Sequence, residues 1–166
     1  MAGKIATDTE RQDSRHLGDP GTPDFRLERY PFYLLNRTVG RYNTLIEARL
    51  RAIGLDVPYW RVLMILGETM PLGVNRIAAA AVINLSTMMR IVQRMERDGL
   101  VRSAPSSGDA RVTEVALTAA GEAKLAAARA ITAPIYATVI DGFSERDFDR
   151  LTILLNRLYG NLGKLR

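Results

Sequence analysis

Residues 75–111 have the sequence NRIAAAAVINLSTMMRIVQRMERDGLVRSAPSSGDAR, and this stretch decides the fold. Its apolar spacing predicts a short helix over roughly Val74–Ala81 and a longer amphipathic helix over about Leu85–Arg97. A tight turn at Val82–Asn84 joins the two helices, and Gly99 ends the second one. Two helices joined by so short a turn predict a helix-turn-helix.

The residues after this pair predict a small hairpin. Short strands are expected at Leu100–Ser103 and Val112–Leu117, on either side of a polar, basic loop at Ala104–Arg111. A hairpin directly after the second helix is the wing of a winged helix-turn-helix. The fold class is therefore mainly α with a small β-hairpin wing, and the arrangement predicts double-stranded DNA as a partner.

Apolar seams at both ends of the chain indicate further helices. In residues 27–52 the apolar positions recur every three or four residues, and the last helix, after a capping box at Ser144 and Asp147, has a similar seam. A long alanine-rich helix at about Ala119–Val139 starts after Thr118. We expect a flexible arm at 1–25, a helical dimerisation region at 26–56 and 118–166, and a winged helix DNA-binding domain at 57–117.

The composition limits the classes of function. Hydrophobic residues make up 47% of the 166 residues, so that a core can form, and no run is long enough for a membrane span. The net charge is +5, and all but three of the 23 basic residues are arginine. Arginine side chains suit phosphates and guanine, although a bias in codon usage would also explain their number. Cysteine is absent and the start lacks a secretory pattern, which together favour a cytoplasmic protein.

A helical wheel divides the helix at Leu85–Arg97 into two sides at about 100° per residue. Its apolar side is expected to hold Leu85, Met88, Met89, Val92 and Met95. The opposite side carries Ser86, Arg90, Gln93 and Arg97, with Thr87 and Arg94 beside them. Hydroxyl, guanidinium and amide groups are those that contact base edges and phosphates, although an ordinary solvent-exposed face has the same composition.

Two further segments complete the predicted DNA interface. Asn75 and Arg76 begin the preceding short helix. In the loop, Arg111 suits a narrow minor groove, and Asp109 can orient an arginine by a charge-assisted hydrogen bond. A surface turn with an incidental ion pair is the alternative for this loop.

The wing resembles that of the MarR family of bacterial transcriptional regulators. The motifs that carry this resemblance are Gly99-Leu100-Val101, Asp109-Ala110-Arg111, Leu117-Thr118 and Gly121. The resemblance covers about residues 27–163 and implies a dimer with interlocking N- and C-terminal helices. The two apolar seams independently favour a homodimer, with intramolecular packing of the two helices as the alternative.

The resemblance also implies a ligand pocket lined by the first, second and fifth helices. The candidate ligand-binding residues are Tyr33, Arg37, Arg41, Tyr42, Trp60 and Met64. Aromatic rings beside an arginine suit a phenolic or other aromatic acid, or its acyl thioester, as the small-molecule effector. Alternatively, the aromatic residues and Met64 belong to the hydrophobic core, and the two arginines lie on a solvent-exposed face of their helix. Family members that respond to thiol oxidation need the cysteine that this chain lacks.

The sequence thus predicts a ligand-responsive dimeric repressor that binds a pseudo-palindromic operator and controls catabolism of aromatic compounds. The alternative is a non-specific architectural DNA-binding protein or a protein-interaction helical module. An enzyme is disfavoured, because no catalytic residues, metal ligands or cofactor motif are recognisable and the single histidine, His16, lies in the arm. No cofactor and no membrane partner are expected.

Overall fold

The computed structural model describes residues 13–106, 108 and 111–165, and the chain divides into two compact units at 1–44 and 45–166. In the first unit the 3-10 turns η1 (Ser14–Gly18) and η2 (Leu27–Arg29) precede the helix α1 (Pro31–Arg51). The backbone N–H of Arg26 donates to the carbonyl of Leu17 at 2.8 Å, which links the two turns. The predicted arm therefore contains local hydrogen-bonded turns from residue 13 onward, which the sequence did not reveal. Residues 1–12 lie outside the described residues.

Helix α1 begins later than the apolar pattern suggested, at Pro31. Tyr30 has an extended backbone, which is the conformation favoured before a proline, and the proline lacks the N–H that a first helical turn leaves unpaired. Gly54, with φ of +70°, lies in the turn that follows the helix. The last part of α1 belongs to the second unit, where Ile46 and Leu50 are fully buried.

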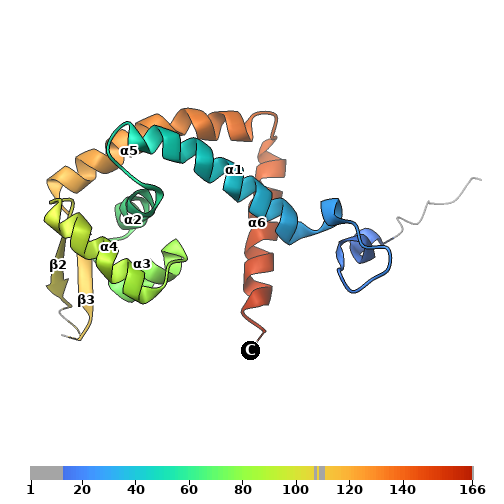
Figure 1. The fold of residues 1–166 in the computed structure, drawn as a ribbon, viewed down its shortest axis with the longest axis horizontal. Helices are drawn as coiled ribbons and strands as arrows, with labels where there is room; N and C mark the ends of the chain where they lie inside the picture. The colour runs from blue at the N-terminus through green and yellow to red at the C-terminus, as the bar shows by residue number, and fades with distance from the viewer. Residues whose placement is uncertain (1–12, 107, 109–110, 166) are drawn as a thin grey trace, which may run out of the picture. The chain divides into compact units, whose positions relative to one another are not determined.

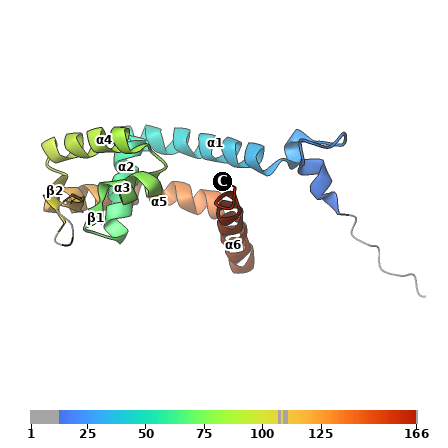
Figure 2. The ribbon, with the colours of Figure 1, turned by 90° about the horizontal axis from the view of Figure 1, so that it is seen from below.

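Three helices of the second unit, α2 (Val57–Glu68), α3 (Val74–Ala81) and α4 (Leu85–Arg97), pack against one another. They lie side by side in both ribbon views (Figures 1 and 2). Asp56 caps α2 by accepting a hydrogen bond from the backbone of Tyr59. Val82 adopts a left-handed conformation between α3 and α4, with φ of 55°. The predicted bounds of α3 and α4 agree with the structure.

A three-stranded antiparallel sheet lies next to these helices, with the order β1-β3-β2. Strands β2 (Val101–Pro105) and β3 (Thr113–Leu117) form the predicted hairpin, and Figure 1 shows α4 beside β2. The third strand, β1 (Leu72–Gly73), pairs with β3 and was not predicted, because two residues carry no periodic pattern. The fold is thus the predicted winged helix-turn-helix with one additional short strand.

The core of the second unit corrects the predicted apolar side of α4. Met88, Ile91, Val92 and Met95 are buried, whereas Leu85 and Met89 are 49% and 50% exposed. The buried side of the helix is thus turned away from Leu85 and Met89, toward Ile91. The reason is that α2, α3 and β2 pack on this side of α4, and a wheel drawn from one helix contains no information about its neighbours.

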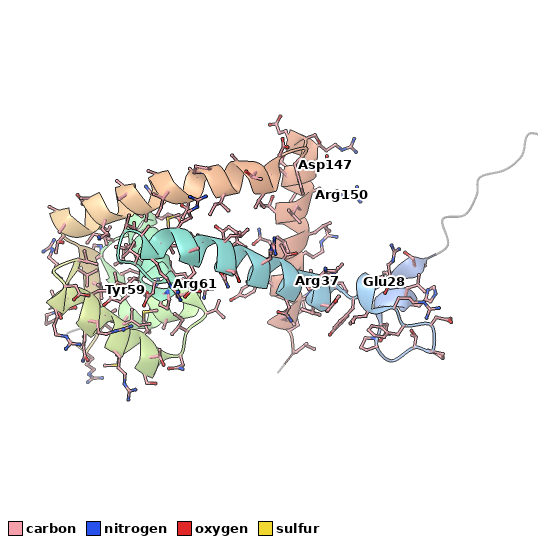
Figure 3. All side chains as sticks on the ribbon, turned by 45° about the horizontal axis from the view of Figure 1, so that its top comes forward. Glu28, Arg37, Tyr59, Arg61, Asp147 and Arg150 are labelled. Atoms are coloured by element: carbon pink, nitrogen blue, oxygen red, sulfur yellow. The ribbon has the colours of Figure 1, made fainter. Side chains whose placement is uncertain are left out.

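Two long helices complete the second unit, α5 (Ala119–Ile140) and α6 (Glu145–Leu162). Ser144 and Asp147 form the predicted capping box at the start of α6, where Figure 3 labels Asp147, and the hydrogen bonds from Ser144 lower the pKa of Asp147. Helix α6 has no buried residue. Across the part of the chain that the structure describes, no helix is long and apolar enough to cross a bilayer.

Candidate DNA interface and ligand-site residues

The predicted polar face of α4 is exposed along its length. We call this set, which comprises Ser86, Arg90, Gln93 and Arg97, the reading face, and all four side chains are exposed. Asn84 holds the start of the helix: its Oδ1 accepts hydrogen bonds from the Thr87 backbone at 2.8 Å and from the Ser86 hydroxyl at 2.9 Å. The first turn of α4 is therefore rigid, while Ser86 retains its acceptor capacity.

A groove of about 410 Å³ runs between α4, the start of α3 and the base of the wing. It brings together Asn75, Gln93 and Arg111, which come from three different elements. Three predicted DNA-contacting residues thus share one concave surface. The groove is lined by Val74, Asn75, Leu85, Met89, Val92, Gln93, Glu96, Ser103, Arg111, Val112 and Thr113.

One polar contact attaches the base of the wing to α4, and a second one lies within the wing. The Ser103 backbone N–H donates to the Glu96 carboxylate at 2.9 Å, and the Ser106 hydroxyl donates to the Glu114 carboxylate at 2.8 Å. Sequence reasoning did not identify Glu96, because a single acid on a basic helix gives no signal of its partner. Arg111 is exposed and lines the groove. Asp109 lies outside the described residues, so its predicted pairing with an arginine stays a prediction.

Arg94, predicted beside the reading face, contacts α2 instead of projecting freely. Its guanidinium lies 5.3 Å from the centre of the Tyr59 ring, and the Tyr59 hydroxyl donates to Asp98 at 2.8 Å. Burial and this hydrogen bond raise the pKa of Tyr59 to about 12. Tyr59 is labelled on α2 in Figure 3. The contacts tie the end of α4 to α2. Sequence reasoning missed them because the partners lie on different elements, with Tyr59 and Asp98 39 residues apart.

Side chains satisfy backbone groups at both ends of α3. The Arg76 backbone N–H donates to the Asn75 side chain at 2.8 Å, and both residues are exposed at the start of the helix. At the other end the guanidinium of Arg61, labelled in Figure 3, donates to the carbonyl of Ala81 at 3.2 Å. A cation at a helix C-terminus is favourable, so Arg61 stabilises the turn that leads to α4.

The predicted ligand residues divide between the two units. In the first unit the Arg37 guanidinium lies 5.4 Å from the centre of the Tyr33 ring, while Arg41 is exposed and burial raises the pKa of the half-buried Tyr42. In the second unit Trp60 and Met64 are half-buried on α2. Neither residue belongs to the fully buried core. A ligand site formed by all six residues stays a prediction.

Comparison with known proteins gives consistent results. Residues 53–112 match the model of the MarR family. The HTH-type transcriptional repressor IacR of Pseudomonas putida is 39% identical over 160 residues, which cover 96% of this chain and 95% of that protein. A MarR family regulator from Silicibacter pomeroyi has a TM-score of 0.75 and 29% identity, covering 85% of this chain and 93% of its own.

Some of the similar solved structures contain a bound molecule, among them one with DNA and one with p-coumaroyl-CoA. The M. tuberculosis regulator MosR in complex with DNA has a TM-score of 0.68 and 25% identity, and the match covers 82% of this chain and 98% of that one. CouR from Rhodococcus jostii, bound to p-coumaroyl-CoA, has a TM-score of 0.73 over 80% of this chain and 94% of its own. At 22% identity, the likeness to CouR concerns the fold alone.

Proposed function

We propose that this chain, which belongs to the MarR family of transcriptional regulators, is a dimeric repressor that binds a pseudo-palindromic operator. A small aromatic acid or aromatic acyl thioester then releases the repressor from this operator. The regulated genes would then serve the catabolism of aromatic compounds. Members of this family regulate transcription and are not enzymes. Such a regulator would work in the cytoplasm, where the bacterial DNA is.

The observation that carries this proposal is the arrangement of polar residues around α4. Gln93 on α4, Asn75 at the start of α3 and Arg111 at the wing line one groove, next to exposed Arg90 and Arg97. Arginine and glutamine side chains form bidentate contacts to guanine and adenine in the major groove, and further arginines neutralise phosphates. A helix with this face, followed by a wing that carries Arg111, suits sequence-specific duplex DNA.

A homodimer is supported by the apolar surface of α6. Ile153 and Tyr159 are 58% and 75% exposed, and further large apolar residues of the helix are also exposed. A surface of this kind is unfavourable in water and marks an interface between proteins. A two-fold dimer would place two copies of α4 about one turn of DNA apart, which requires a pseudo-palindromic operator.

The effector proposal starts from the side chains of the predicted ligand site. Arginines such as Arg37 and Arg41 suit a carboxylate or the phosphates of an acyl thioester, and Tyr42 and Trp60 provide half-buried aromatic surface. The chain contains no cysteine, so thiol oxidation cannot be its signal. Such an aromatic ligand would bind more tightly to a dimer conformation in which the two α4 helices are wrongly spaced for DNA. The affinity for the operator then falls according to how much more tightly the ligand binds that conformation than the DNA-binding one.

The test is a comparison of specific and random DNA. The full-length protein should bind DNA from its own promoter region far more tightly than random duplex at the same salt concentration. Similar affinities for both would instead indicate the non-specific architectural protein. Aromatic acids and their acyl thioesters should then be screened by thermal shift, and a ligand that raises the melting temperature should also release the operator.

Variants of two kinds separate specificity from general affinity. Arg111→Ala should weaken binding to most sequences alike, because a wing contact to the backbone is lost. Gln93→Ala or Arg90→Ala should relax the preference at particular bases by roughly 1–3 kcal/mol. If both helix variants kept the specificity of the native protein, the reading face would be wrongly assigned.

A further inference from the structure

Two large apolar side chains of α4 are turned out of the core. Leu85 and Met89 are 49% and 50% exposed, although they lie on the helix that carries the buried Met88 and Val92. They are one helical turn apart, so they form one continuous apolar strip. This strip lies between the buried side of the helix and the reading face.

The strip forms part of the groove between α4 and the wing. Leu85 and Met89 line it together with Gln93, a member of the reading face, and with Arg111 of the wing. Apolar side chains exposed among groups that bind DNA lose their contact with water when the helix enters a duplex, and this desolvation is favourable. Arg111 lines the groove with the strip, and Arg90 is exposed on the same helix. The carboxylate of Glu96, which also lines the groove, accepts a hydrogen bond from the Ser103 backbone. The two arginines are complementary to a polyanion and thereby select DNA as the occupant.

The major groove offers one apolar group to such a strip, which is the 5-methyl group of thymine. We propose that Leu85 and Met89 contact thymine methyl groups and thereby select thymine at particular operator positions. This inference rests on the proposed function, because it requires that α4 enters the major groove. It adds an apolar component to the polar contacts of the reading face.

The test compares thymine with uracil, which differ only in this methyl group. Binding sites are first selected from a random duplex library with the full-length protein, and each thymine is then replaced by uracil, one position at a time. Loss of a contacted methyl should weaken binding about fourfold per half-site, since burial of one such group is worth roughly 0.8 kcal/mol and 1.4 kcal/mol is tenfold. Thymines outside the contact should tolerate uracil without change.

Leu85→Ala and Met89→Ala then assign the contact to a side chain. Each variant should lose the preference for thymine over uracil at its own position and keep it elsewhere. Met70→Ala is the matched control, because Met70 is 44% exposed and lies outside the groove. Both positions on α4 are half-exposed, so the variants should fold, and a thermal melt checks this.

The outcomes distinguish this inference from the proposed function. If no sequence is selected, the proposed function fails and the inference fails with it. If a site is selected but contains no thymine that is sensitive to uracil, or if both variants keep the full preference, only the inference is overturned. If the two variants keep the preference for thymine over uracil but an aromatic acid no longer raises their melting temperature, the groove binds a small molecule instead.

Discussion

The substitution Tyr59→Phe tests whether the hydroxyl of Tyr59 holds the end of α4 against α2. It removes the hydroxyl that donates to Asp98 at 2.8 Å and leaves the buried ring in place. A hydrogen bond to a charged group is worth about 1.5–3 kcal/mol, but the exposed Asp98 regains water in the variant. We therefore expect a loss of about 1 kcal/mol in the free energy of unfolding, or roughly 2–4 °C in melting temperature.

The pH dependence gives a second and sharper readout. Folding raises the pKa of Tyr59 from 10.0 to about 12, so the folded state holds this proton more tightly than the unfolded state. The stabilisation is fully present below pH 10 and is lost as the pH rises toward 12. The stability difference between the native protein and Tyr59→Phe should therefore shrink over this range, because the variant lacks the titrating group.

Denaturant unfolding at several pH values measures both effects. Tyr136→Phe is the control, because Tyr136 is 52% exposed on α5 and its loss should leave stability unchanged. Equal stability of Tyr59→Phe and the native protein near neutral pH would contradict the proposed role. So would a stability difference that stays constant to high pH.

Three further substitutions test the local structure. Gly121→Ala should destabilise the protein by roughly 1–3 kcal/mol in thermal melts, because a Cβ would collide with the carbonyl oxygen of Leu100. The control Gly160→Ala has open space on its helix and should be neutral or stabilising. Asn84→Ala removes the cap of α4 and should cost about 1 kcal/mol in denaturant unfolding. Asp147→Asn should lower the melting temperature near neutral pH, and this deficit should shrink as the pH falls below 3.8, because the pKa of Asp147 is lowered in the folded state.

Local signals explain why α3 and α4 could be predicted from the sequence. The turn at Val82, the cap at Asn84 and the glycine at Gly99 act within a few residues of the helix ends. The polar face of α4 is likewise a property of one helix. Strand β1 could not be predicted, because its two residues are a strand only through pairing with β3, more than 40 residues later.

The candidate site was less predictable where it depends on packing between elements. The contact of Tyr59 with Asp98 and the hydrogen bond of Glu96 to the wing join residues whose spacing carries no pattern. Arg94 belongs to the same class, because its position over the Tyr59 ring depends on how α2 packs against α4. Sequence reasoning identified residues suited to bind DNA but not those that hold α4 in place.

The wrong prediction at Leu85 and Met89 has a physical cause that bears on function. Large apolar residues of a helix are normally buried, and these two are half-exposed instead. Such departures from the usual pattern are expected at functional sites. Replacement of both by polar residues would make α4 more soluble without loss of core packing, since the buried side is formed by residues such as Met88 and Ile91. Their apolar character is explained if a partner covers them, and Arg111 in the groove with exposed Arg90 on the same helix makes DNA the partner that fits.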